Sequence, residues 1–301
     1  MLRLLLTRLI VLCLAAPLTG LAREFPLPLP GNDVVGEISS VTSRYEDTLS
    51  DIARANDLGY LEISEANPGV DPWLPGEGLE IVLPTRFMLP PGPREGIVIN
   101  LAELRLYYYP RGENRVVTYP LGIGREGWET PVAETRVTGK LPNPSWTPPE
   151  SIRFEHLENG DVLPQVVPPG PDNPLGAYAI YLALPGYLLH GTNKPFGVGM
   201  RVSHGCIRLY PEDIEKLFPR IAINTRVRII NEPYKLGWVE GRLYIEAHQP
   251  LSEQRQHAAV DLARLQTAVT AAIGPRRPTI DWNTLMEAAL THSGIPLPVS
   301  P

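Results

Sequence analysis

Two residues close together in the sequence have the side chains for nucleophilic catalysis. Cys206 lies in the run SHGCIR at 203–208, and His190 precedes it by sixteen residues. The only other cysteine of the chain, Cys13, belongs to an N-terminal stretch that we expect to be cleaved off on export. Exported proteins rarely keep an unpaired cysteine, because their compartment is oxidising. We therefore predict that the thiol of Cys206 is a nucleophile.

The segment between these two residues can bring them together. His190 ends an apolar run that reads as a strand, which is a rigid place for a general base. Glycines recur along the segment and allow it to turn back; they are Gly191, Gly197, Gly199 and Gly205. A nearby imidazole can lower the pKa of a cysteine from about 8.5 to below neutral. We predict His190 as the base and a lowered pKa for Cys206.

The residues around the cysteine are predicted to support it. The amides of Gly205 and Cys206 can bind a developing oxyanion, and Ser203 can brace the loop through hydrogen bonds. Arg208 would share one side of an extended strand with Cys206 and bind a substrate carboxylate there; a structural ion pair is the alternative. His204 is either a second acid/base or a residue that only shapes the loop.

A zinc site is the non-catalytic alternative for this cluster. It would use His190, His204 and Cys206, but no Cys-x-x-Cys or His-x-x-x-His pair completes a set of four ligands. We therefore predict no metal and no cofactor.

Residues 1–22 have the pattern of a signal peptide. Arg3 and Arg8 precede an apolar core, and the run GLA at 20–22 offers small residues for cleavage before Arg23. An uncleaved signal anchor is the alternative. No later stretch reaches the ~20 apolar residues of a membrane span, so we predict none in the mature chain. The net charge of -6 argues against a nucleic-acid partner.

The rest of the chain divides into three parts. Residues 36–84 read as strand, two short helices and strand, with a capping box at 48–51. Residues 95–231 read as mostly strands with one helix that starts at Pro211. Residues 232–301 form an extension with helical spacing, which we expect to pack on the part before it.

Within the second part, residues 141–175 form a proline-rich insertion in which we expect little regular structure. Loops of this length in compact domains are usually functional lids or disordered, and this one contains Trp146. The surrounding strands predict a mainly β fold, a sandwich or barrel, and exclude a parallel α/β sheet.

The motif around Cys206 resembles that of the YkuD-type L,D-transpeptidases. The matching runs are HGTN at 190–193 and GMRVSHGCIRL at 199–209. The runs EGIVIN at 95–100, RLYYYP at 105–110 and PPGPDNP at 168–174 resemble the periplasmic Gram-negative branch of this family. That branch carries an N-terminal LysM module, the small unit that binds peptidoglycan glycan.

Residues 36–84 resemble such a LysM module. The similarity rests on DTL at 47–49, NP at 67–68 and LPG at 74–76, although Glu46 stands where these modules usually carry glycine. A spacer that only packs against its neighbour is the alternative. If the unit binds glycan, its deletion should weaken binding to the cell wall and spare the turnover of small substrates.

The family resemblance implies a β-sandwich-like catalytic domain, a periplasmic location and a peptidoglycan substrate. Cys206 would attack the bond between diaminopimelate and D-alanine of a tetrapeptide stem, and an amine would then take the acyl group. His190 would act as base toward the thiol and as acid toward the leaving amine, oriented by the Gly191 carbonyl. Trp146 would belong to a lid that excludes water.

Several acceptors are compatible with this chemistry. Resemblance to the lipoprotein-attaching branch favours the C-terminal lysine of a Braun-type outer-membrane lipoprotein. The diaminopimelate amine of a second stem would give a 3–3 cross-link. Water would make the enzyme an L,D-carboxypeptidase or a hydrolase that releases the lipoprotein. An inactive scaffold that binds the cell wall is the non-enzymatic alternative.

Overall fold

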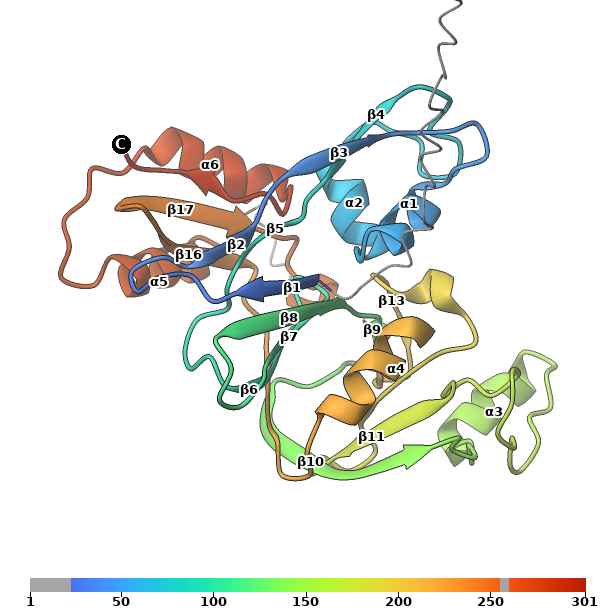
Figure 1. Ribbon diagram of the computed structural model, residues 1–301. Helices are drawn as coiled ribbons and strands as arrows, with labels where there is room; N and C mark the ends of the chain where they lie inside the picture. Colours follow the sequence, from blue (N-terminus) through green and yellow to red (C-terminus); the bar gives the residue numbers. More distant parts are fainter. Residues whose placement is uncertain (1–22, 255–259) are drawn as a thin grey trace, which may run out of the picture.

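The computed structural model describes residues 23–254 and 260–301 (Figure 1). The predicted signal peptide at 1–22 lies outside these residues. No helix within the described ranges is long and apolar enough to cross a membrane. Strands outnumber helices in the described part of the chain, which confirms the mainly β class.

The largest element is a curled sheet whose nine strands follow the order β1-β8-β7-β6-β15-β10-β11-β12-β14. Two pairs, β6–β15 and β12–β14, are parallel, and the other pairs are antiparallel. The strands are β1 (Arg23–Pro26), β6 (Gly96–Asn100), β7 (Arg105–Tyr109), β8 (Arg115–Pro120), β10 (Ala133–Pro142), β11 (Tyr178–Leu182), β12 (Leu188–His190), β14 (Ile207–Arg208) and β15 (Arg226–Ile230).

One face of this sheet is covered by α4 (Pro211–Arg220). The helix begins with a proline in its first turn, as predicted, and buries Ile214 and Leu217 in the same apolar cluster as Leu189 and Ile207 of the sheet. A short parallel pair, β9 (Ile123–Gly124) with β13 (Arg201–Ser203), leads into the cysteine loop after the 3₁₀ turn Pro195–Gly197. The core therefore lies directly behind the candidate nucleophile.

The N-terminal part has the predicted order of strand, two helices and strand. These elements are β3 (Ser39–Thr42), α1 (Leu49–Ala55), α2 (Tyr60–Ala66) and β4 (Glu80–Leu83), and β3 pairs with β4. The capping box is present, because the Thr48 hydroxyl accepts from the Asp51 amide and the Asp51 carboxylate accepts from the Thr48 amide. A second antiparallel pair, β2 (Val34–Gly36) with β5 (Arg86–Met88), frames the unit.

This N-terminal part shares its core with the other face of the main sheet. Leu49 and Ile81 lie in one buried cluster with Tyr107 of β7. Arg105 of the same strand is fully buried and forms an ion pair with Glu62 of α2, with Nε 2.6 Å from Oε1. Strands β7 and β8 are therefore buried on both faces.

The insertion is more regular than predicted. Strand β10 continues to Pro142, and α3 (Glu150–Glu158) lies within the insertion (Figure 1). The expectation of little regular structure is wrong here, because nine residues without glycine or proline follow Pro149 at the N-cap. The base of the insertion is tied together by Asn173, whose buried amide donates to the Pro144 carbonyl at 2.8 Å.

The C-terminal part is a small folded unit with its own core. The sheet consists of β16 (Tyr234–Val239), β17 (Arg242–Ala247) and β18 (Leu297–Pro298), and the helices α5 (Leu262–Ile273) and α6 (Trp282–Thr291) pack on it. The two helices agree with the helical spacing predicted for this extension, whereas the hairpin β16–β17 was missed. The unit packs on the part before it through Lys235 of β16, which donates to the hydroxyl of Tyr107 in β7 at 3.2 Å. It also contacts β2 and β5, which the sequence did not predict.

A buried polar cluster joins the C-terminal part to the turn between β6 and β7. Lys235 of β16 places its Nζ 2.8 Å from Glu103 and 2.6 Å from Glu246, and His248 lies 2.7 Å from Glu246. Glu103, Glu246 and His248 are close enough together to bind a metal ion. The ammonium of Lys235 already lies between the two carboxylates, so we interpret the cluster as a structural ion-pair network.

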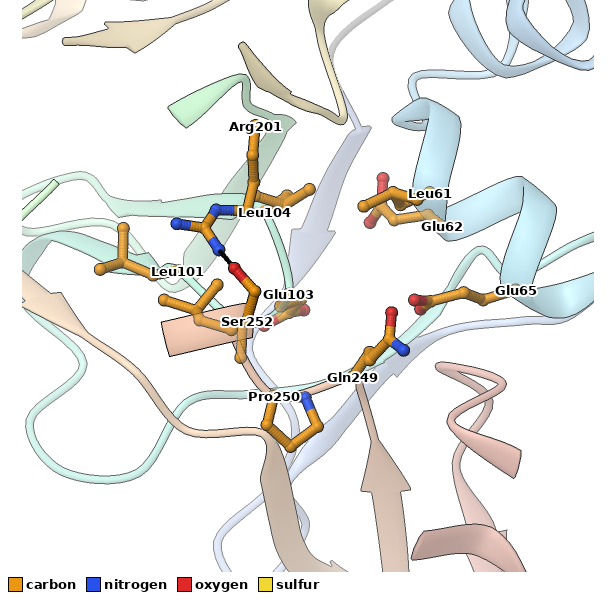
Figure 2. Close-up of a pocket in the computed structure, with 12 residues that line it drawn as sticks. Leu61, Glu62, Glu65, Leu101, Glu103, Leu104, Arg201, Gln249, Pro250 and Ser252 are labelled. Carbon is orange, nitrogen blue, oxygen red and sulfur yellow. Dashed lines mark hydrogen bonds between the residues drawn. The ribbon is translucent and has the colours of Figure 1, made fainter. Parts of the chain in front are cut away.

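A small cavity lies at the same junction. Figure 2 shows it between α2, the β6–β7 turn and the segment after β17, lined by Glu65, Arg201 and Gln249 among others. Its volume of about 110 Å³ is well below the ~300 Å³ at which small-molecule sites begin. None of the candidate catalytic residues lines it.

Candidate active site

Strands β12 and β14 bring the candidate nucleophile and base together. They pair in parallel, with Leu189 opposite Ile207 and His190 opposite Arg208. Leu189 and Ile207 are fully buried in the core. Because side chains alternate along a strand, His190, Arg208 and the preceding Cys206 face the other side. The structure thus gathers three of the predicted site residues on one face.

The ring of His190 is held by backbone carbonyls. Its Nδ1 lies 2.6 Å from the Gly191 carbonyl oxygen, and the backbone of Leu175 and Pro174 also favours the protonated ring. A carbonyl accepts only from N–H, so Nδ1 carries the proton and Nε2 keeps its lone pair. The contact with Gly191 is the one expected to orient the ring. Burial, together with the charge of Arg208, lowers the pKa of His190 to about 3.

The thiol of Cys206 is not preformed as a thiolate. Burial raises its pKa, and the Leu188 backbone and Arg208 offset this only in part. Its Sγ lies 3.6 Å from the Gly186 carbonyl, and within the described ranges no hydrogen bond joins it to His190. The predicted lowering of the thiol pKa is wrong for this state, because a neutral imidazole supplies no positive charge.

The turn that carries the cysteine is tightly enclosed. Gly205 has φ +99°, and a Cβ there would lie 3.0 Å from the Tyr187 ring, so only glycine fits without strain. Thr130 donates from Oγ1 to the Gly205 carbonyl at 2.7 Å. Ser203 donates from Oγ to the Cys206 carbonyl at 2.6 Å, which is the bracing bond predicted for it. Thr130 and Tyr187 were missed, since no local pattern marks them.

His204 points toward the insertion. Its Nε2 lies 3.0 Å from Oε2 of Glu155 on α3, and the Trp128 ring meets it edge to face at 4.8 Å between centroids. Arg125 forms an ion pair with the same Glu155 carboxylate. Of the two roles considered for His204, this geometry supports shaping of the loop. Glu155, Trp128 and Arg125 carried no signal in the sequence.

Of the two predicted substrate-binding residues, Arg208 lies beside the Cys206 thiol and Trp146 does not contact it in the described part of the chain. Arg208 is half-buried beside Cys206, and its Nε has no hydrogen-bond partner among the described residues. Trp146 lies in the insertion, where its backbone pairs with that of Val167 at 2.9 and 2.8 Å. No side-chain contact between Trp146 and the cysteine is present in the described part of the chain.

Cys206 directly precedes β14 and His190 ends the neighbouring strand β12. Beside them lies the Arg208 Nε, which has no hydrogen-bond partner among the described residues. A thiol and an imidazole held on paired elements are compatible with nucleophilic catalysis. Residues 94–229 match the family model YkuD, described as the L,D-transpeptidase catalytic domain. The chain belongs to the L,D-transpeptidase family of peptidoglycan-modifying enzymes.

Curated relatives extend this similarity over most of the chain. The "Probable L,D-transpeptidase YcfS" of Escherichia coli K12 is 49% identical over 80% of this chain and 77% of its own length. The "Probable L,D-transpeptidase YbiS" of the same strain is 42% identical over 93% of this chain and 92% of its own. A solved L,D-transpeptidase from Mycobacterium smegmatis is 17% identical over 50% of this chain and 63% of that one, with a TM-score of 0.36.

Proposed function

We propose that Cys206 is the nucleophile of a periplasmic L,D-transpeptidase and that His190 is its base. The observation that carries this proposal is the register of β12 and β14, which sets Cys206, His190 and Arg208 on one face while their neighbours enter the core. The donor is a peptidoglycan tetrapeptide stem, cleaved between diaminopimelate and D-alanine.

The proposed steps follow from the protonation states of the site. Nε2 of His190 takes the proton from Sγ as the sulfur attacks the donor carbonyl, because the imidazole is neutral and the thiol is protonated. Arg208 binds the carboxylate of the terminal D-alanine, and the amides of Gly205 and Cys206 receive the oxyanion. The proton on His190 then passes to the D-alanine amine as it leaves.

The proposed acceptor is the C-terminal lysine of an outer-membrane lipoprotein. The similarity of 95–100, 105–110 and 168–174 to the branch that attaches lipoprotein supports this choice. Glu126 and Glu129 are exposed on the loop beside the nucleophile turn, and acidic side chains favour a cationic acceptor.

The N-terminal part is proposed to bind peptidoglycan glycan. Tyr45 and Trp73 are 76% and 60% exposed on two loops of this unit. Ser43 ties these loops together through bonds to Gly76 and Leu79. The Trp73 ring stacks on Tyr60 at 6.2 Å between centroids, and exposed aromatic rings are suited to stacking on sugars. Export by the segment 1–22 would place the enzyme in the periplasm with this substrate.

Mass spectrometry of reaction products tests the proposal. Purified residues 23–301 are incubated with a diaminopimelate tetrapeptide muropeptide, with and without a peptide that ends in lysine. We expect an adduct of the two peptides that is absent from Cys206→Ala. A 3–3 dimer or a free tripeptide in both tubes would overturn the acceptor, and the same products from Cys206→Ala would overturn the nucleophile.

A further inference from the structure

We propose that Glu155 is a specificity-determining residue, which holds the insertion against the nucleophile loop and so favours transfer of the acyl group to an amine over its loss to water. The inference rests on the function proposed above. It concerns the closed arrangement of three segments that are distant in sequence: the loop after β9, the helix α3 and the turn before Cys206.

The Glu155 carboxylate of α3 contacts both the turn before Cys206 and the loop after β9. Its Oε2 lies 3.0 Å from Nε2 of His204, two residues before the nucleophile. Its Oε1 accepts from Nη2 of Arg125, which follows β9. The Trp128 ring packs against His204 at 82° and lies below the Arg125 guanidinium. One carboxylate therefore joins the insertion to both sides of the nucleophile turn.

Few other contacts hold α3 in place. Ile152 is its one buried residue, whereas Phe154 and Leu157 are about 60% exposed. The ion pair of His156 with Asp161 stays inside the insertion. Among residues 23–254 and 260–301, Glu155 is the only side chain of α3 with a hydrogen bond or ion pair to a residue outside 141–175. Loss of its charge should therefore release the helix.

The contact of Glu155 with the nucleophile turn would influence whether an amine or water reaches the acyl-enzyme. Attack by an amine breaks the C–S bond, forms a C–N bond and returns a proton to sulfur. Attack by water breaks the same bond and forms C–O, giving the free acid and the same thiol. Water is present at far higher concentration than the acceptor, so transfer requires that the insertion restrict access to the thioester.

The test compares Glu155→Gln and Glu155→Ala with Glu158→Gln, a matched control on the exposed side of the same helix. The donor is the tetrapeptide muropeptide and the acceptor a lysine-ending peptide at fixed concentration. We expect the ratio of transferred to hydrolysed product to fall about three- to tenfold in both Glu155 variants, the effect of losing a networked ion pair. Donor consumption should change less, and Glu158→Gln should match the wild type.

A second readout does not depend on turnover. Iodoacetamide should alkylate Cys206 faster in Glu155→Ala than in the wild type or Glu158→Gln, because release of α3 from His204 and Arg125 would widen the approach to the nucleophile turn. An unchanged product ratio together with an unchanged alkylation rate would overturn the role of Glu155. Failure of the proposed function looks different: wild-type protein would then release no D-alanine, whatever the alkylation rates show.

Discussion

At the scale of single residues, the reaction depends on which of His190 and Cys206 carries a proton. His190 is neutral because it is buried beside Arg208, and Cys206 is protonated because its own surroundings disfavour a charge. These pKa shifts disfavour a resting imidazolium–thiolate pair, so we expect proton transfer to accompany attack. Gly191 makes this possible by accepting from Nδ1, which leaves Nε2 available.

The pH dependence of alkylation should reveal these protonation states. The reactive form is the thiolate, and burial raises the folded-state pKa of Cys206 above its ordinary value. We expect the iodoacetamide rate at Cys206 to keep rising through pH 9 without a plateau near neutrality. Cys206→Ala serves as the blank. A plateau below pH 7 would instead show a preformed ion pair.

Thr130 tests the shape of the nucleophile turn. Its hydroxyl accepts from the Gly124 amide at 3.0 Å and donates to the Gly205 carbonyl. Thr130→Val keeps the shape but leaves both backbone groups unpaired, which should cost roughly 1–3 kcal/mol and lower kcat/KM about tenfold. Thr130→Ser should restore the rate. Equal kcat/KM for the valine and serine variants would remove this positioning role.

At the scale of elements, α4 contains a buried carboxyl group that receives no hydrogen bond from the described residues. Asp213 is buried in its first turn, and neither carboxylate oxygen has a hydrogen-bond partner among the described residues. Burial, with Asp57 and Glu212 nearby, raises its pKa to about 8 from 3.8. Between these two values the folded state binds a proton that the unfolded state has lost, so this group lowers stability as pH rises.

Asp213→Asn should remove the loss of folding stability that Asp213 causes as the pH rises. We expect the variant to be more stable than the wild type at pH 8 by at least ~1 kcal/mol, with a smaller difference at pH 5. Urea denaturation at both pH values measures this. Glu215→Gln on the exposed side of α4 is the control. A variant that is less stable at pH 8 would show that the carboxylate is ionised and paired.

The aromatic loops of the N-terminal part give a second prediction at this scale. Trp73→Ala removes an exposed ring that stacks on Tyr60 at 6.2 Å. We expect binding to isolated sacculi to weaken about fivefold or more, with turnover of soluble muropeptide unchanged. Trp282→Ala, an exposed tryptophan of the C-terminal unit, is the control. Equal losses in both variants would contradict a glycan surface on these loops.

At the scale of the whole molecule, the N-terminal part belongs to the catalytic scaffold. It covers Tyr107 and neighbouring residues of the main sheet, and its helix α2 contacts the loop between the base and the nucleophile. There the Leu61 amide donates to the Gly199 carbonyl at 3.1 Å. Deletion of 36–84 would expose this face, so we no longer expect it to spare turnover.

Replacing Glu62 tests how strongly the stability of the N-terminal part is coupled to that of the main sheet. Glu62→Ala leaves Arg105 charged, fully buried and without its carboxylate, which should destabilise the protein by about 3–5 kcal/mol. Thermal unfolding should still show one transition, at a lower temperature. Glu46→Ala, exposed in the same unit, is the control. Separate transitions for the two parts would argue for independent domains.

The sequence by itself determined the family of the protein, its mainly β class and its candidate nucleophile and base. These follow from contiguous motifs and from local signals such as the capping box at Thr48 and the proline that opens α4, which act over a few residues. Only the tertiary structure decided that His204 meets Glu155, that Thr130 holds Gly205 and that Arg105 is paired with Glu62. Each of these contacts joins residues more than forty positions apart. The protonation of Cys206 and His190 could likewise not be predicted from the sequence motif. A pKa depends on burial and on neighbouring charges that exist only in the folded chain.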